Sequence, residues 1–179
     1  MKKYLILSLM ALPMVVMAQK KRLSAEAKSS EIRYAMVHPM HSWEAVSKSF
    51  QCVIVWDESK QLIEAVAVAV PVKTFDSQNS NRDSHALEVL EALKYPNVTF
   101  SSSQVSGQDQ NWKVKGKLTF HGVTREIEFP ITLKQTATSL EVTGGFTVLM
   151  QDYQIENPTL LGIKTKEDIR LQFKVLAKK

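Results

Sequence analysis

The stretch WKVKGKLTFHGVTREIEFPITLK, residues 112–134, alternates apolar with charged or polar side chains in two runs. In the first run, every second residue from Trp112 to Phe120 is apolar or glycine, and the residues between them are lysine or threonine. In the second run, every second residue from Ile127 to Leu133 is apolar. Because successive side chains of a strand point to opposite faces of a sheet, this spacing predicts an antiparallel hairpin with one buried face.

The same alternation recurs along most of the chain and predicts about eight strands. They cover residues 32–38, 46–56, 61–72, 98–103, 112–121, 126–134, 140–148 and 168–175. A closed sheet of about this size leaves no exposed strand edge, and its interior is just wide enough for packed side chains or one small ligand. The predicted fold class is all-β, an antiparallel barrel of about eight strands, although a two-sheet sandwich would produce the same periodicity.

One short helix is predicted over residues 83–94. Its apolar residues at 86, 89, 90 and 93 share one helical face. Asp83 or Ser84 is placed to accept hydrogen bonds from the free N–H groups of the first turn. The Tyr95-Pro96 step favours an end there, because a residue before proline avoids the helical conformation.

Two motifs around this helix and the hairpin resemble the signature of the YceI-like family. The first has the form R-D-x-H followed by Y-P-x-x-x-F-x-S, and the second is GKLTFHGVT at residues 116–124. The residues of the first motif are Arg82, Asp83, His85, Tyr95, Pro96, Phe100 and Ser102. The resemblance covers about residues 32–175. It implies a lipocalin-like barrel in the bacterial envelope that holds a long isoprenoid or a similar lipid. Residues 86–91 and 150–155 depart from the family pattern, which leaves the lipid's size and head group open.

The N-terminal residues 1–18 have the pattern of a secretory signal peptide. Lys2 and Lys3 precede an apolar run that is short for a membrane span, and Ala18 supplies a small residue at the cleavage site. The alternative is an uncleaved membrane anchor. Cleavage leaves a single domain over residues 19–179 and predicts a periplasmic protein. Loss of the two lysines lowers the formal net charge from +5 to +3, which is compatible with transient contact at a membrane surface but does not predict a nucleic-acid partner.

The interior of the barrel has two interpretations, an ordinary packed core and an apolar cavity for an alkyl or isoprenyl chain. The resemblance favours the cavity, and Gly116 and Gly144 are expected to leave space in it. Burial of each CH₂ group contributes about 0.8 kcal/mol, so a long chain can be held without an ionic contact. The predicted lining is Trp112, Val114, Leu118, Phe120, Phe129, Ile131, Val142, Phe146, Val148, Leu171 and Phe173.

Arg82, Asp83 and His85 are the candidates for a polar mouth. Arg82 has the donor geometry to bind a phosphate, and the helix N-terminus would lie beside it. The alternative is that Arg82 and Asp83 pair with each other and brace the start of the helix. His121 lies in the hairpin turn and is interpreted as a hydrogen-bond partner that stabilises the turn.

Two other classes of function compete with lipid binding. A metal-dependent enzyme is disfavoured, because His38-x-x-His41 has no matching cysteine or carboxylate cluster and no nucleophile motif is present. The prediction is therefore a binding protein without catalytic residues, metal or cofactor. The family resemblance implies that its ligand is an isoprenoid, an isoprenoid quinone or a fatty amide. A structural protein acting through protein contacts is the second rival. The valines and alanines of residues 61–72 make a candidate homodimer face, and Cys52 is expected to be a buried, inert thiol.

Overall fold

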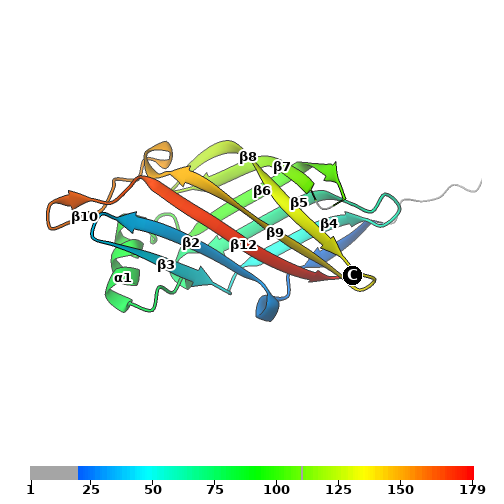
Figure 1. Ribbon diagram of the computed structural model, residues 1–179, viewed down its shortest axis with the longest axis horizontal. Helices are drawn as coiled ribbons and strands as arrows, with labels where there is room; N and C mark the ends of the chain where they lie inside the picture. Colours follow the sequence, from blue (N-terminus) through cyan, green and yellow to red (C-terminus); the bar gives the residue numbers. More distant parts are fainter. Residues whose placement is uncertain (1–19, 110) are drawn as a thin grey trace, which may run out of the picture.

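The computed structural model describes residues 20–109 and 111–179, so the predicted signal peptide lies outside the described residues. Ten strands form one curled antiparallel sheet, in the order β1-β4-β5-β6-β7-β8-β9-β12-β2-β3, and two short strands pair separately (Figure 1). The strands of the large sheet are β1 (Lys20–Ser24), β2 (Glu31–His38), β3 (His41–Ser47), β4 (Gln51–Asp57), β5 (Leu62–Pro71), β6 (Asn97–Gln108), β7 (Asn111–Phe120), β8 (Val123–Gln135), β9 (Ser139–Leu149) and β12 (Asp168–Lys178). The separate pair is β10 (Thr159–Leu160) and β11 (Ile163–Lys164).

The curled sheet brings its two edge strands back toward the rest of the barrel. The end of β1 reaches β12 through a bridge between Ala25 and Ala177, and β3 reaches the segment after β5 through a bridge between Val46 and Asp76. These bridges cover part of the edge hydrogen-bonding groups that an open sheet would expose. The all-β class predicted from the alternation is confirmed, and so is the lipocalin-like barrel that the family resemblance implied.

The count of about eight strands is too low, because two edge strands lack a clear alternating pattern. β1 consists mostly of polar residues, and Leu23 is its buried side chain. β3 begins directly after a two-residue turn, where His38 pairs with His41. The predicted strands 32–38 and 46–56 leave residues 39–45 outside any strand and merge the end of β3 with β4.

The helix also differs from its prediction over residues 83–94. Helix α1 spans Ser80–Val89, and Asn79 is its N-cap, because the Asn79 side chain accepts a hydrogen bond from the Arg82 backbone N–H at 3.0 Å. An asparagine oxygen in this position satisfies a donor that the first turn leaves free. The helix ends before the Tyr95-Pro96 step, since Glu91 adopts a positive φ of 44° that an α-helix does not allow.

Gly116 and Gly144 do not leave the predicted space in the interior. A Cβ atom on Gly116 would lie 2.5 Å from the Ser101 carbonyl oxygen, and one on Gly144 would lie 2.7 Å from the Phe173 ring. Neighbouring strands and rings already occupy these positions. Both glycines therefore permit close packing, and neither lines the two interior cavities described below.

Cys52 lies in the core, and burial raises the pKa of its thiol to about 12. This confirms the expected inert thiol, because the thiolate is the reactive form. On the outer face of the sheet, Ala67 and Val53 are exposed. The homodimer through this face stays a prediction.

Candidate functional site

A cavity of about 440 Å³ lies at the α1 end of the barrel. Its walls come from the inner face of α1, from β2 and β3, from the ends of strands β5, β6, β7, β9 and β12 that lie toward α1, and from residues 158–165. Most of the lining is apolar. The exposed polar residues that border it, and so mark the mouth, are His41, Asn79, Asn81, His85 and Thr159.

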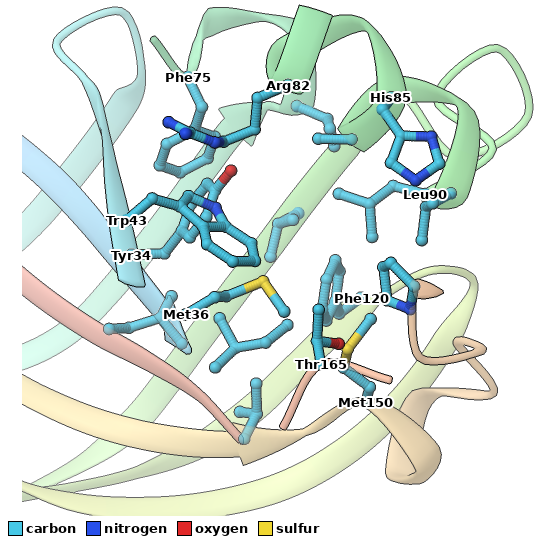
Figure 2. A pocket seen from close by; sticks show the side chains of 18 of the residues that line it. Tyr34, Met36, Trp43, Phe75, Arg82, His85, Leu90, Phe120, Met150 and Thr165 are labelled. Atoms are coloured by element: carbon cyan, nitrogen blue, oxygen red, sulfur yellow. The ribbon is translucent and has the colours of Figure 1, made fainter. Parts of the chain in front are cut away.

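Aromatic and sulfur-containing side chains make the wall beneath α1. Figure 2 shows Tyr34, Met36 and Trp43 on one side of the cavity and Phe120 with Met150 on the other. The Tyr34 and Phe75 rings meet edge to face with centroids 5.2 Å apart. Burial raises the pKa of the Tyr34 hydroxyl, so this wall stays uncharged at neutral pH. Such a surface suits an apolar chain.

A second, smaller cavity of about 110 Å³ lies among the residues of the barrel core. Its lining is almost entirely apolar and includes Phe129, whose ring stacks on Phe146 at 4.6 Å. Five residues line both cavities and form the partition between them: Ile32, Val70, Val98, Leu118 and Leu171. The two spaces therefore adjoin, with a wall of branched aliphatic side chains between them.

The structure divides the predicted apolar lining between these two cavities. The residues that line the main cavity are Leu118, Phe120, Val148 and Leu171. Those that line the smaller one are Val114, Leu118, Phe129, Ile131, Val142, Phe146, Leu171 and Phe173. Trp112 lines neither. It is half-buried near the start of β7, packs against the edge of the barrel core, and donates from its indole N–H to the Asp109 carbonyl at 3.0 Å.

Arg82 and His85 border the main cavity, as predicted for a polar mouth. The Arg82 guanidinium lies 5.5 Å from the centroid of the Trp43 ring and donates to the Ser77 carbonyl at 3.4 Å. Figure 2 shows both side chains reaching from α1 over the cavity.

Asp83 is placed differently from its two neighbours. Its carboxylate accepts a hydrogen bond from the Ser77 N–H at 3.1 Å and holds the loop before α1. Asp83 does not line the cavity. No Arg82–Asp83 ion pair is present among the described residues, so the predicted mutual pairing is wrong although Asp83 does brace the helix start.

His121 confirms its predicted role in the hairpin turn. Its Nδ1 donates to the Tyr153 carbonyl at 3.1 Å, and its Nε2 lies 3.0 Å from a carboxylate oxygen of Glu91. The Tyr95 ring packs edge to face on the imidazole at 4.6 Å. These contacts fasten the segment after α1 to the β7–β8 turn.

His38 fastens the β10–β11 hairpin to the wall of the cavity. This buried imidazole accepts from the Met40 N–H through Nδ1 at 3.2 Å, so its Nε2 carries the proton and donates to the Ile163 carbonyl at 3.1 Å. The Lys166 N–H donates to the Val37 carbonyl at 2.9 Å beside it. The hairpin is thereby held at the edge of the mouth.

Thr165 is the one lining residue with an unpartnered buried side-chain oxygen among the described residues. Its side chain is 8% exposed, and its hydroxyl has no hydrogen-bond partner. Figure 2 shows it between Phe120 and Met150. An unpaired hydroxyl in an apolar site is unfavourable until a ligand or water satisfies it.

The predicted site residues did not include several that line the main cavity, among them Tyr34, Met36, Trp43 and Thr165. Tyr34 and Met36 share the inward phase of the predicted strand 32–38, so the alternation there was a usable signal. Trp43 fell beside a predicted loop, and Thr165 lies in an irregular segment without a repeating pattern.

Neither metal ligation nor a membrane-crossing helix has support in the described part of the chain. Residues 20–109 and 111–179 contain no group of three or more His, Cys, Asp or Glu side chains arranged to hold an ion. The same residues form no helix that is long and apolar enough to cross a membrane.

A curled antiparallel sheet around an apolar cavity is the architecture of lipocalin-like proteins. Within that class, the model of the YceI-like domain matches residues 23–177, and the chain belongs to this family.

Relatives in the family are distant in sequence. The chain is 27% identical over 141 residues to a UPF0312 protein of Pectobacterium carotovorum, which covers 74% of this chain and 73% of the relative. It is also 27% identical over 120 residues to protein YceI of Salmonella newport, which covers 65% of this chain and 61% of the relative.

Solved structures share the fold at lower identity. BcnA of Burkholderia cenocepacia aligns with a TM-score of 0.76 at 18% identity, over 86% of this chain and 99% of that one. A polyisoprenoid binding domain from Saccharophagus degradans, implicated in plant cell wall breakdown, aligns with a TM-score of 0.69 at 13% identity, over 87% and 97%.

Proposed function

We propose that this protein binds one apolar lipid, with the tail in the main cavity and the polar group near the mouth, and carries or stores it in the bacterial periplasm. The observation that carries the proposal is the apolar cavity of about 440 Å³ beneath α1. The polyisoprenoid binding named for the Saccharophagus domain supports an isoprenoid ligand. An isoprenoid quinone and a fatty amide share the required chemistry. The role requires no catalytic residue, metal, cofactor or nucleic acid.

The cavity volume sets the length of the tail. A methylene group takes roughly the volume of a water molecule, about 30 Å³, so the main cavity accommodates on the order of fifteen such groups. At about 0.8 kcal/mol for each buried CH₂, ten of them contribute about 8 kcal/mol before the entropy lost on association is subtracted. Apolar burial alone therefore supports useful affinity.

The direct test is native mass spectrometry of the mature protein, purified without detergent from the envelope of its own bacterium. We expect a stoichiometric apolar adduct that organic extraction releases and fragmentation identifies. A bare protein mass that stays unchanged after incubation with farnesol and with fatty amides would contradict the proposal and indicate a filled core.

The unpartnered Thr165 hydroxyl predicts that the ligand carries a neutral group able to hydrogen-bond. Thr165→Val keeps the side-chain shape and removes this oxygen. A net hydrogen bond contributes about 0.5–1.5 kcal/mol, so we expect affinity for farnesol to fall by a factor of about 2 to 13. Binding of the matching hydrocarbon, farnesene, should not fall. Calorimetric titration measures both.

The matched control is Thr138→Val, at an exposed threonine in the β8–β9 turn that lines neither cavity. It should leave both affinities unchanged. Equal loss of farnesol and farnesene binding in Thr165→Val would show a packing effect and remove the hydroxyl from the site.

A further inference from the structure

The exposed apolar side chains of the described residues are concentrated at one end of the barrel. Large apolar side chains with high exposure are Met40 (61%), Val53 (37%), Leu93 (104%), Leu161 (80%) and Ile163 (43%). All but Val53 belong to turns or to the short β10–β11 hairpin. Val53 lies on the outer face of β4.

Strand pairing places these turns together at the α1 end. The β2–β3 turn, which carries Met40, adjoins the start of β12, because Ala35 pairs with Arg170. Leu93 precedes β6, whose start pairs with the end of β7 next to the His121 turn. Figure 1 shows the β2–β3 turn, α1 and the β10–β11 hairpin at the same end of the molecule. Turns at the opposite end, at residues 58–61 and 136–138, have polar or small side chains.

The tip of the β10–β11 hairpin has an unfavourable residue for its backbone conformation. Leu161 and Gly162 form a two-residue turn in which both have positive φ, 52° and 78°. Such turns favour Asn-Gly, because a non-glycine side chain is strained at positive φ unless it is asparagine or aspartate. The Leu161 side chain is nevertheless 80% exposed, so packing within the monomer does not explain a leucine here.

The hairpin is also part of the cavity mouth. Pro158, Thr159 and Thr165 on its flanks line the cavity, and the carbonyl of Ile163 accepts the His38 hydrogen bond. Exposed apolar tips thus stand around the opening through which a lipid must enter.

The exposed charges around the β10–β11 hairpin do not favour an anionic partner. Lys164 and Lys166 are exposed, and so are Glu156 and Glu167 in the same segment. The signs are balanced, so steering by charge is weak. A partner that fits separate apolar tips around a lipid-sized opening is the hydrocarbon boundary of a bilayer, into which such side chains partition with little dependence on lipid charge.

We propose that the α1 end docks on a lipid bilayer by inserting Met40, Leu161 and Ile163, with Leu93 beside them, so that the cavity mouth faces the membrane. This rests on the proposed lipid-binding function. Lipid then passes between bilayer and cavity without crossing water.

The test measures co-sedimentation with phosphatidylcholine vesicles. In the variant carrying Met40→Ser, Leu161→Ser and Ile163→Ser, the ratio of vesicle-bound to free protein should fall at least tenfold. Val53→Ser removes an exposed apolar side chain elsewhere and should leave this ratio unchanged. Binding should change little with salt. Wild-type protein that stays in the supernatant, or a triple variant that still sediments, overturns the docking.

Farnesol binding in vesicle-free buffer distinguishes failure of the membrane docking from failure of the proposed lipid-binding function. The triple variant should bind farnesol like the wild type. A wild type that binds farnesol but not vesicles defeats the docking alone, whereas a wild type that binds no lipid in either assay defeats the lipid-binding function.

A single substitution at Leu161 is expected to move thermal stability and vesicle binding in opposite directions. Leu161→Asn places the residue type that tolerates positive φ in the turn, so the thermal midpoint should stay or rise while the vesicle-bound fraction falls. A fall in vesicle binding accompanied by a fall in the thermal midpoint would assign Leu161 to stability and contradict its membrane role.

Discussion

Replacing Ala86 with tryptophan is expected to abolish lipid uptake while the barrel stays folded. Ala86 lies on the inner face of α1 and lines the main cavity. An indole at this position would occupy the space that the lipid tail requires, because the partition of aliphatic side chains closes the far side of the cavity. A titration with farnesol followed by calorimetry should show no measurable heat of binding.

The matched control lies on the same helix. Ser84 is exposed and does not line the cavity, so Ser84→Trp adds the same side chain outside the site and should leave farnesol affinity unchanged. Retained binding in a folded Ala86→Trp protein would place the ligand outside this cavity. Far-ultraviolet circular dichroism shows whether each variant keeps the strand signal.

Leu118→Ala is expected to lengthen the lipid that the protein accepts. Leu118 is 4% exposed and lines both cavities, so truncation removes part of their partition and joins about 440 Å³ to about 110 Å³. The free energy of unfolding should fall by about 2–5 kcal/mol, as is usual for leucine-to-alanine changes in a core. The chain-length optimum in a series of prenyl alcohols should shift toward the longer members.

Leu140→Ala separates the two effects of that substitution. Leu140 is fully buried in the other core cluster of the barrel and lines neither cavity. The variant should lose comparable stability in urea denaturation and keep the wild-type chain-length optimum. An optimum that moves equally in both variants would trace the shift to general loosening of the core and contradict a partition at Leu118.

The alternating runs on β7 and β8 predicted the all-β class and their antiparallel pairing correctly, because one face of each strand is buried and the other is charged. β1 and β3 escaped detection for opposite reasons. β1 is an edge strand of mostly polar residues, so it has no alternating pattern. β3 follows a two-residue turn that contains Pro39, and a proline there is equally typical of a longer loop. The predicted start of the helix was wrong, because the Asn79 side chain caps a helix that begins three residues before the start that the apolar pattern indicated.

The candidate site could be predicted only in part. Alternation identifies inward-facing residues such as Phe129 and Val148, but it does not tell a packed interior from a cavity. Whether Gly116 opens space depends on the strand and ring that approach it from β6. Thr165 gains its importance from an absent hydrogen-bond partner, which only the folded arrangement reveals.

The β10–β11 hairpin pairs with itself and contributes no strand to the ten-stranded sheet. Substitutions, insertions or deletions within it therefore leave the ladder of the barrel intact, because connecting segments outside a sheet tolerate change more readily than the strands do. Its flanks nevertheless line the cavity. Over evolutionary time, a protein with this design can acquire a different cargo by sequence drift in one short segment while the rest of the molecule is inherited unchanged.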